Sequence, residues 1–329
     1  MQMTPTPMSE FDPALLSSNE LHRSWLEVPV GLNEHARLPL LAIRGAAPGP
    51  TALFVAGIHG DEFEGIAAIP RAMRELDPST VRGTVLALPV GNVFAFHSQS
   101  RTSPASLDGG NLARSFPGRE SGTPTERLAA ALFAFATRLL GPDDLVVDLH
   151  SAGTRYRYSR LVGFREIPGS ARAASEEAAR HFGNIDLSVL WSIVPTRGMF
   201  NSETSVAGIP TVAAEAPGQG SCSDDDVQFY ADGLTNLLRY MGMIPGPRPA
   251  RDSRAAASVT EILASTDGLF VTRVEADERV SSGQVLGRII DAFGELRSEV
   301  IAPHDGRLTA LRTFGTVYAG EYVAWICSE

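Results

Sequence analysis

Short apolar runs alternate with helix-forming segments between residues 51 and 241, and this alternation constrains the fold more than any other feature of the chain. The run 144–149 (DLVVDL) is almost continuously apolar, which is typical of a parallel strand covered by helices on both faces. Further strands are predicted at 51–56, 84–90, 188–194 and 210–215, and helices at 61–76, 123–140, 170–182 and 224–241. The sequence therefore predicts an α/β fold with a mostly parallel central sheet covered by helices.

The character of the chain changes after a proline-rich segment at 245–249 (PGPRP). Small and polar residues follow it, and beyond them short strand-like runs alternate with glycine turns, which is typical of an all-β module. We expect four parts. They are an N-terminal tail and first strand at 1–35, the α/β domain at 36–247, a linker at 248–262, and a small C-terminal β-sandwich module at 263–329.

The absence of lysine excludes several chemistries at once. All 28 basic residues are arginine, so the chain offers no lysine for a Schiff base, for a P-loop or for a lipoyl or biotinyl arm. The C-terminal module has a turn at 302–306 that is similar to those of biotinyl/lipoyl domains, but without lysine we expect it to act as a cap. Arginine is also left as the permanently charged anchor for substrate carboxylates.

Charge and cysteine content point to a cytoplasmic protein that acts on small molecules. The formal net charge is −10, which disfavours a nucleic-acid partner because phosphate binding needs a basic face. Cys222 and Cys327 are too few for a disulfide framework, and we expect free thiols in a reducing compartment. The chain shows no signal-peptide pattern and no run of 18 apolar residues, so no membrane association is expected.

Two predicted strand ends carry metal-binding side chains. His59 and Glu62 follow the strand at 51–56, three residues apart where a loop enters a helix, so both can face one point. His150 lies just after the strand at 144–149. Because ligands of open α/β sheets gather at the carboxyl ends of strands, these three side chains are expected to meet. Two imidazoles and one carboxylate are the protein ligands of a catalytic zinc site.

Other charged residues surround this predicted centre. Asp148 lies two residues before His150 on the same strand, so its carboxylate faces the same side and is expected to accept a hydrogen bond from a ligand histidine. A cluster of arginines follows His150. It is either a solvated face or an anion-attracting mouth of the site, and it comprises Arg155, Arg157, Arg160 and Arg165.

Four motifs carry a resemblance to a known family. They are HGDE at 59–62, NLARSFPG at 111–118, DLHS at 148–151, and Glu215 at the end of an apolar strand. In order and spacing, over residues 50–218, they resemble those of the succinylglutamate desuccinylase/aspartoacylase family of the zinc-carboxypeptidase-like superfamily. The chain is most similar to the bacterial branch that contains N-acetyl-diaminobutyrate deacetylase.

The resemblance implies a zinc-carboxypeptidase-like fold and one Zn²⁺ per chain on His59, Glu62 and His150. Glu215 would take a proton from zinc-activated water and pass one to the leaving amine. Arg101 would stabilise the developing oxyanion together with the zinc ion.

The resemblance also implies where the substrate binds. Arg114 would pair with a substrate carboxylate, with Asn111 in the same motif, and Arg197 and Tyr156 lie where further substrate contacts are expected. This chain departs from the family at Ala113, where the usual pattern has asparagine. The departure removes a polar anchor beside Arg114.

The activity expected on these grounds is that of a zinc-dependent amidohydrolase. It would remove an acyl group from an N-acylated amino acid or a similar small amide, with an anionic N-acyl amino acid as its partner. A metallocarboxypeptidase that acts on short peptides is the alternative, disfavoured because a β cap would narrow the mouth of the site. A non-catalytic metal-binding protein is a third alternative. It is disfavoured because such a protein would need neither Glu215 nor Arg101. Homo-oligomerisation stays open.

Overall fold

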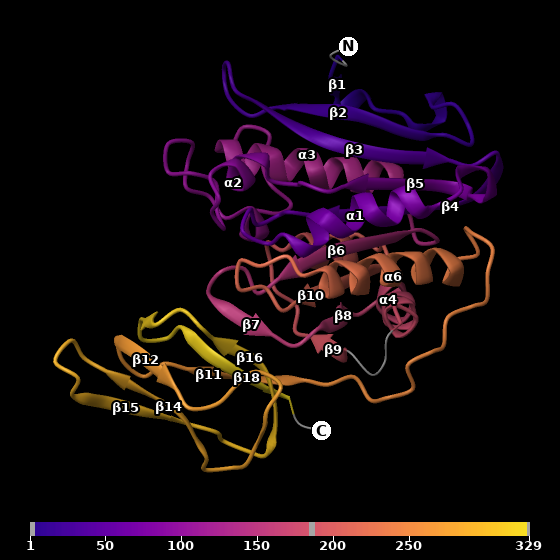
Figure 1. The fold of residues 1–329 in the computed structure, drawn as a ribbon. Helices are drawn as coiled ribbons and strands as arrows, with labels where there is room; N and C mark the ends of the chain where they lie inside the picture. Colours follow the sequence, from indigo (N-terminus) through magenta and orange to yellow (C-terminus); the bar gives the residue numbers. More distant parts are fainter. Residues whose placement is uncertain (1–3, 184–187, 328–329) are drawn as a thin grey trace.

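The computed structural model describes residues 4–183 and 188–327. Within these residues, nine strands form a mixed sheet in the order β1-β2-β3-β5-β4-β6-β10-β8-β9 (Figure 1). Its strands are β1 (Thr6–Pro7), β2 (Leu21–Pro29), β3 (His35–Arg44), β4 (Ala47–Ala56), β5 (Arg82–Leu88), β6 (Leu145–Ser151), β8 (Leu161–Arg165), β9 (Val189–Ile193) and β10 (Thr211–Ala216).

The four central strands, β5, β4, β6 and β10, are parallel to one another. The direction reverses on both sides of this block, because β3 pairs antiparallel with β5, and β8 pairs antiparallel with β10. The parallel block brings the carboxyl ends of β4, β6 and β10 to the same edge of the sheet. The fold class predicted from the sequence is confirmed.

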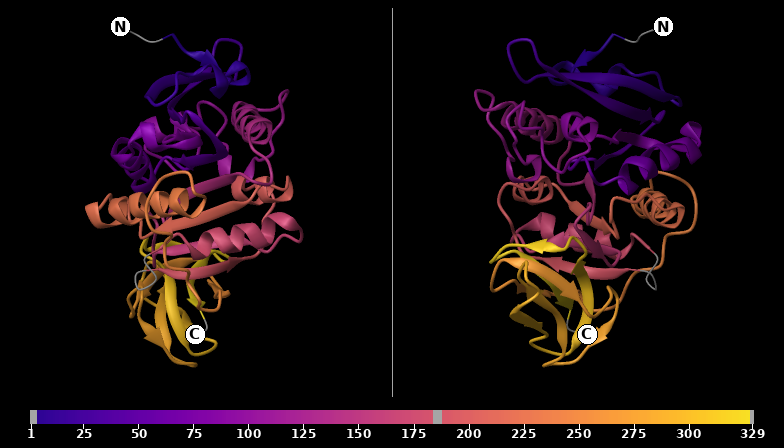
Figure 2. Two further views of the ribbon diagram at one scale, coloured as in Figure 1. Left: turned by 90° about the vertical axis from the view of Figure 1, so that its right-hand side faces the viewer. Right: turned by 60° about the vertical axis from the view of Figure 1, so that its left-hand side comes forward.

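Helices cover both faces of this sheet. They are α1 (Glu64–Glu75), α2 (Val93–His97), α3 (Pro124–Leu139), α4 (Ser170–Arg180), α5 (Phe200–Val206) and α6 (Asp224–Tyr240), with short 3-10 turns at Met8–Glu10, Pro13–Leu15, Pro78–Thr80 and Leu112–Arg114. Helices α1 and α6 pack on one face and α3 on the other, as the edge-on view shows (Figure 2, left). None of the helices in the described ranges is long and apolar enough to cross a membrane.

Two apolar cores lie on the two faces of the sheet, as the alternation of side chains along a strand requires. On β4, Phe54 belongs to the core under α1 and α6, whereas its neighbour Leu53 belongs to the core under α3. On β6, Val147 belongs to the core under α1 and α6, and Val146 belongs to the core under α3. All seven residues of β6 are buried, as expected for its almost continuously apolar sequence.

The N-terminal region forms more regular structure than the sequence analysis predicted. Strands β2 and β3 pair along their whole length as an antiparallel hairpin, and β3 joins the central block through β5. The predicted tail contributes β1, which pairs with β2. Strand β8 and helix α5 lie in two separate segments for which no element was predicted, and both contribute residues to the site described below.

The C-terminal module is a β-sandwich built from two antiparallel sheets. Its strands are β11 (Val259–Leu263), β12 (Gly268–Thr272), β13 (Arg279–Val280), β14 (Val285–Ile290), β15 (Leu296–Ile301), β16 (Gly306–Arg312), β17 (Thr316–Val317) and β18 (Tyr322–Cys327). A strand of the α/β body, β7 (Tyr156–Tyr158), pairs with β16 and so extends one of the two sheets (Figure 1). The module is therefore hydrogen-bonded to the segment that directly follows His150.

Candidate active site

The carboxyl ends of two neighbouring parallel strands bring the three predicted ligands together. His59 and Glu62 lie in the turn between β4 and α1. His150 lies one residue before the end of β6. Gly57 directly follows β4 and has φ +63°, a conformation that favours glycine and turns the chain away from the strand. All three side chains are almost completely buried, with relative exposures of 2%, 3% and 5%.

The donor atoms of these residues converge on the Glu62 carboxylate. His59 Nδ1 lies 2.7 Å from Glu62 Oε1, and His150 Nδ1 lies 2.8 Å from Glu62 Oε2. One ligand atom from each of the three residues lies within 4.8 Å of the others, as a single metal ion requires. The backbone N–H of Ser151 also donates to Glu62 Oε2, at 3.1 Å, and holds the carboxylate in place.

The second nitrogen of each imidazole faces an oxygen acceptor. His150 Nε2 lies 3.2 Å from Asp148 Oδ2, the contact that the sequence predicted. His59 Nε2 lies 3.2 Å from Asn111 Oδ1, which also accepts from the backbone N–H of Ala113 at 3.0 Å. These acceptors favour a proton on Nε2 and leave the Nδ1 lone pairs directed at Glu62.

Either a proton or a metal ion can therefore join the imidazoles to Glu62. A lone pair on Nδ1 and a carboxylate oxygen repel each other at these distances unless a proton or a metal ion is shared between them. The donor set, two imidazoles and one carboxylate, is that of catalytic zinc sites, and the residues present fit such an ion.

The charged groups of the cluster shift one another's pKa values. Burial alone would raise the pKa of Glu62, but the two histidines outweigh it and hold this pKa well below its usual range. Burial lowers the pKa of His59. Burial also disfavours the charged form of His150, yet the Asp148 and Glu62 carboxylates outweigh it and raise the His150 pKa well above its usual range. Without a metal ion, the Glu62 and Asp148 carboxylates are thus balanced by the protonated His150 ring and by Arg101.

Glu215 lies beside this cluster on the neighbouring strand. Its Cα is paired with that of His150 in the parallel register of β10 and β6. Burial raises the pKa of Glu215 to about 8. Its Oε2 is buried and has no hydrogen-bond partner among the described residues, although it borders a cavity. The sheet thus holds a buried carboxyl with a raised pKa next to the three convergent side chains.

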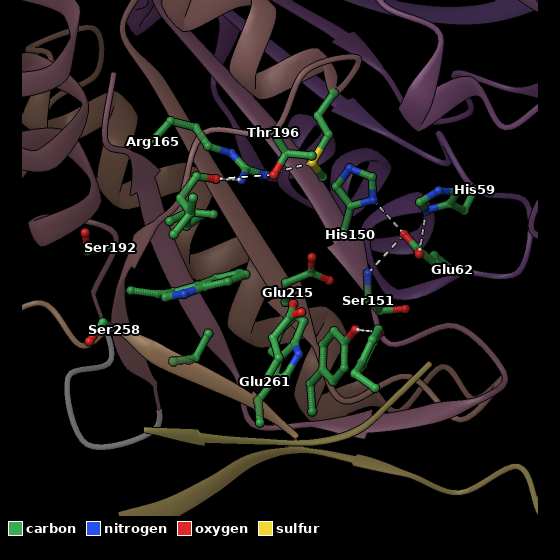
Figure 3. A pocket seen from close by; sticks show the side chains of 18 of the residues that line it. His59, Glu62, His150, Ser151, Arg165, Ser192, Thr196, Glu215, Ser258 and Glu261 are labelled. Atoms are coloured by element: carbon green, nitrogen blue, oxygen red, sulfur yellow. Dashed lines mark hydrogen bonds and ion pairs between the residues drawn. The ribbon is translucent and has the colours of Figure 1, made fainter. Parts of the chain in front are cut away.

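A cavity of about 460 Å³ opens from these residues toward the C-terminal module (Figure 3). Arg101 and Arg114 line it, and Arg101 Nη1 donates to Glu62 Oε1 at 2.7 Å. Four aromatic side chains from both parts of the chain also line this cavity, and they are Tyr158, Trp191, Tyr322 and Trp325. The module therefore forms part of the wall.

The remaining residues predicted to bind substrate are placed differently. Tyr156 borders an adjoining cavity, and its hydroxyl donates to the backbone carbonyl of Tyr322 at 3.1 Å. The Arg197 side chain is 88% exposed and does not line the cavity described above. Ala113 is buried in the apolar core and is also absent from the cavity wall, so its methyl group packs against protein.

Arg165 is a cavity residue to which the sequence analysis gave no specific role. It ends the buried strand β8, and three of its donors bind neutral acceptors, namely Asn201 Oδ1 at 2.7 Å, the Val194 carbonyl at 2.8 Å and Met199 Sδ at 3.1 Å. Burial lowers the pKa of Arg165 to about 10, so the guanidinium stays charged at neutral pH. Two of its five N–H groups remain for a ligand.

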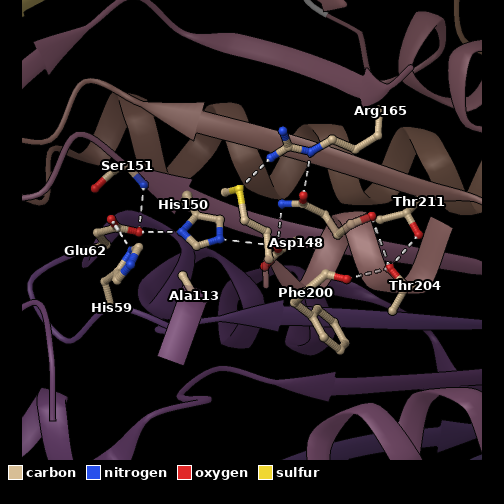
Figure 4. Close-up of polar contacts among 12 residues, drawn as sticks. His59, Glu62, Ala113, Asp148, His150, Ser151, Arg165, Phe200, Thr204 and Thr211 are labelled. Atoms are coloured by element: carbon tan, nitrogen blue, oxygen red, sulfur yellow. Dashed lines mark hydrogen bonds and ion pairs between the residues drawn. The ribbon is translucent and has the colours of Figure 1, made fainter. Parts of the chain in front are cut away.

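Arg165 is also linked to the predicted metal ligand (Figure 4). The Asn201 amide that accepts from Arg165 donates to Asp148 Oδ2 at 2.7 Å, and Asp148 in turn contacts His150. Asn201 comes from α5, which lies between the predicted strands 188–194 and 210–215, where no element was predicted. In the sequence, Arg165 could have been found from its position at the end of the apolar run 161–164. No local sequence pattern pointed to Asn201.

Fold and site together define an α/β protein with a mixed sheet and, at the carboxyl edge of that sheet, a His₂Glu cluster that could hold a metal ion. Residues 48–241 match the model of the succinylglutamate desuccinylase/aspartoacylase catalytic domain. The chain belongs to this family of deacylases, and the resemblance inferred from the motifs is confirmed.

Individual relatives match over nearly the whole chain. The N-alpha-acetyl-L-2,4-diaminobutyric acid deacetylase of Halomonas elongata is 29% identical, over 99% of this chain and 96% of the relative. The product-bound structure of the ectoine utilization protein EutE (DoeB) from Ruegeria pomeroyi is 27% identical, with a TM-score of 0.83 over 95% of this chain and 97% of the other. A succinylglutamate desuccinylase/aspartoacylase structure from Rhodobacter sphaeroides gives the same identity and TM-score, over 97% and 98%.

Proposed function

We propose that this protein is a zinc-dependent amidohydrolase that removes the acyl group from an N-acylated amino acid. The observation that carries the proposal is the position of Glu215. Its buried, unpartnered carboxyl oxygen borders the same cavity as the three convergent ligand side chains. A site that only stored a metal ion would gain nothing from a carboxyl group that burial makes ready to exchange protons near neutral pH.

His59, Glu62 and His150 would hold the zinc ion, with Asn111 and Asp148 fixing the two imidazole rings from behind. When bound there, zinc supplies a Lewis acid that polarises the acyl carbonyl and makes water acidic enough to attack at neutral pH.

Glu215 performs the proton transfers. Its carboxylate accepts the proton that the attacking water loses as the C–O bond forms. The resulting carboxylic acid then donates this proton to the amide nitrogen, so that the C–N bond breaks and the products are a carboxylic acid and a free amine. The raised pKa of Glu215 suits both directions of this exchange.

Different arginines bind the oxyanion of the transition state and the carboxylate of the substrate. Arg101 already binds Glu62 at the cluster, which puts its guanidinium beside the acyl group, where the oxyanion develops. Arg114 and Arg165 line the same cavity without a carboxylate partner among the described residues. They offer the charged donors that a substrate carboxylate requires.

The name of the Halomonas relative makes N-acetyl amino acids the first substrates to test. The purified protein, loaded with zinc, is incubated with a panel of N-acetyl, N-succinyl and N-formyl amino acids and with short peptides, and the free amine is measured. We expect hydrolysis of at least one N-acyl amino acid, its loss on treatment with a chelator and its recovery on addition of zinc. Cleavage of peptides alone would favour a carboxypeptidase and contradict the proposal.

A further inference from the structure

One carboxylate on the cavity wall comes from the C-terminal module. Glu261 lies in the middle of β11, the first strand of that module, and borders the cavity. Side chains alternate along a strand, and the next residue, Ile262, packs against the module's own core. Glu261 therefore faces the α/β body, and Figure 3 shows its side chain rising from β11 on the same side of the cavity as Glu215.

Glu261 is an exposed residue, and two tryptophans line the cavity with it. Glu261 is paired directly with Trp325 in the antiparallel register of β11 and β18. The ring of Trp191, from β9 of the α/β body, lies 5.4 Å from that of Trp325, measured between centroids. Trp325 is only 8% exposed, and its indole N–H has no partner among the described residues although the side chain borders the cavity. Glu261 and Trp325 thus lie side by side on the module and border the same cavity.

The other carboxylates on the wall already have roles. Glu62 is bound by His59, His150 and Arg101, and Glu215 performs the proton transfers of the proposed reaction. Glu261, by contrast, makes no side-chain hydrogen bond or ion pair with any residue in the described ranges 4–183 and 188–327. Three arginines line the same cavity, yet none is paired with Glu261. The cavity therefore presents separate positive and negative wall groups to a ligand.

We propose that Glu261, with the rings of Trp191 and Trp325, forms a subsite for a positively charged group on the amine half of the substrate. A carboxylate without a partner attracts an ammonium group, and nearby aromatic rings add to this attraction. The carboxylate of the same amino acid would go to the arginines. The ligand class is then an N-acyl amino acid with an ammonium group on its side chain. This inference rests on the proposed deacylase function and gives the module a role in selectivity.

The test compares two substrates that differ in one charge. Nα-acetyl-2,4-diaminobutyrate carries a side-chain ammonium group, and Nα-acetyl-2-aminobutyrate lacks it. For the zinc-loaded wild type we expect a higher kcat/KM on the first. Glu261→Gln should lower kcat/KM on the charged substrate by about tenfold or more and leave it within about twofold on the neutral one. Glu261→Arg should lower kcat/KM on the charged substrate further. It should also make Nα-acetylglutamate, whose side chain carries a carboxylate, the preferred substrate.

Glu299→Gln is the matched control, because Glu299 is an exposed glutamate on β15 of the same module and does not line the cavity. It should leave both rates unchanged. A second readout does not depend on turnover. Calorimetric binding of 2,4-diaminobutyrate to the zinc-loaded protein should be tighter than that of 2-aminobutyrate, and Glu261→Gln should remove the difference.

The outcomes separate the inference from the function on which it rests. If both substrates are hydrolysed and Glu261→Gln leaves their ratio unchanged, the cation subsite is wrong and the deacylase stands. If the zinc-loaded protein hydrolyses no N-acyl amino acid, the proposed function is wrong. The binding measurement then still decides the subsite, since equal affinity for the two amines would overturn it.

Discussion

Glu215 and His150 are direct neighbours in the parallel register of β10 and β6, so the backbone hydrogen bonds of the sheet fix the spacing between the carboxyl proposed to transfer protons and a histidine proposed to bind the metal ion. Both residues lie at the carboxyl ends of buried strands. Neither side chain depends on a flexible loop for its position, which is the preorganisation that acid–base catalysis requires.

Removing a histidine from the cluster should remove the metal. His59→Ala or His150→Ala leaves two of the three protein ligands, and we expect zinc content to fall from about one ion per chain to well below it, with activity lost in parallel. Metal analysis of the purified proteins after dialysis measures this. Stoichiometric zinc in either variant would show that the mutated histidine is not a ligand.

The contacts behind His150 should tune metal affinity without being essential for it. Asn201→Leu removes the amide that joins Arg165 to Asp148, while keeping a side chain of similar size. We expect zinc affinity to weaken by about 10- to 100-fold, the usual effect of losing a group that orients a ligand. Competition with a fluorescent chelator gives the dissociation constants. An unchanged constant would mean that Asp148 holds His150 without help from Asn201.

Arg165 should contribute to recognition of the substrate carboxylate. Arg165→Gln is expected to raise KM for an N-acyl amino acid by roughly ten- to a hundredfold, since a hydrogen bond to a charged group contributes about 1.5–3 kcal/mol. The effect should be small for the same compound with its carboxylate amidated. Arg197→Gln serves as the control, because the Arg197 side chain is 88% exposed and outside the cavity. Equal losses on both compounds would contradict a carboxylate contact.

The metal-free protein should become less stable as the pH rises, partly because of Glu215. Its pKa is raised to about 8, so the folded protein keeps a proton that the unfolded chain has lost. This contribution to stability is complete below the ordinary carboxyl pKa and is lost as the pH rises through about 8. Each pH unit in that window is worth about 1.4 kcal/mol.

Comparison with the neutral variant Glu215→Gln isolates the contribution of the Glu215 carboxyl to the free energy of unfolding. In urea unfolding of chelator-treated protein between pH 5 and pH 8, the variant should gain stability relative to wild type as the pH rises. A difference between the two proteins that does not change with pH would show that the Glu215 carboxyl is not held neutral by burial.

Much of the site could be predicted from the sequence because its central residues are local features of strands. His59, His150 and Glu215 each follow or end an apolar run, and parallel strands bring such positions to one edge of a sheet. Arg165 has the same kind of position, after the run 161–164, but arginines in a cluster are more often solvated, and only the packing of β8 shows that this one is buried.

Other parts depend on contacts that no local pattern records. Glu261 and Trp325 lie on the cavity wall because β7 pairs with β16 and draws the module against the α/β body. That pairing joins segments more than 140 residues apart. The motif of Asn111 marked its importance, but the contact with His59 needed the geometry of the loop that precedes the Leu112–Arg114 turn.

The most direct test of the account is the turnover of Glu215→Gln in its zinc-loaded form. The substitution keeps the size of the side chain and leaves His59, Glu62 and His150 in place, so we expect folding and stoichiometric zinc to be retained. Because the amide can neither accept nor donate the proton, kcat should fall by about 10²- to 10⁴-fold on a substrate that the wild type hydrolyses. Wild-type kcat in a variant shown to contain zinc would mean that another group transfers the proton, and would contradict the central claim.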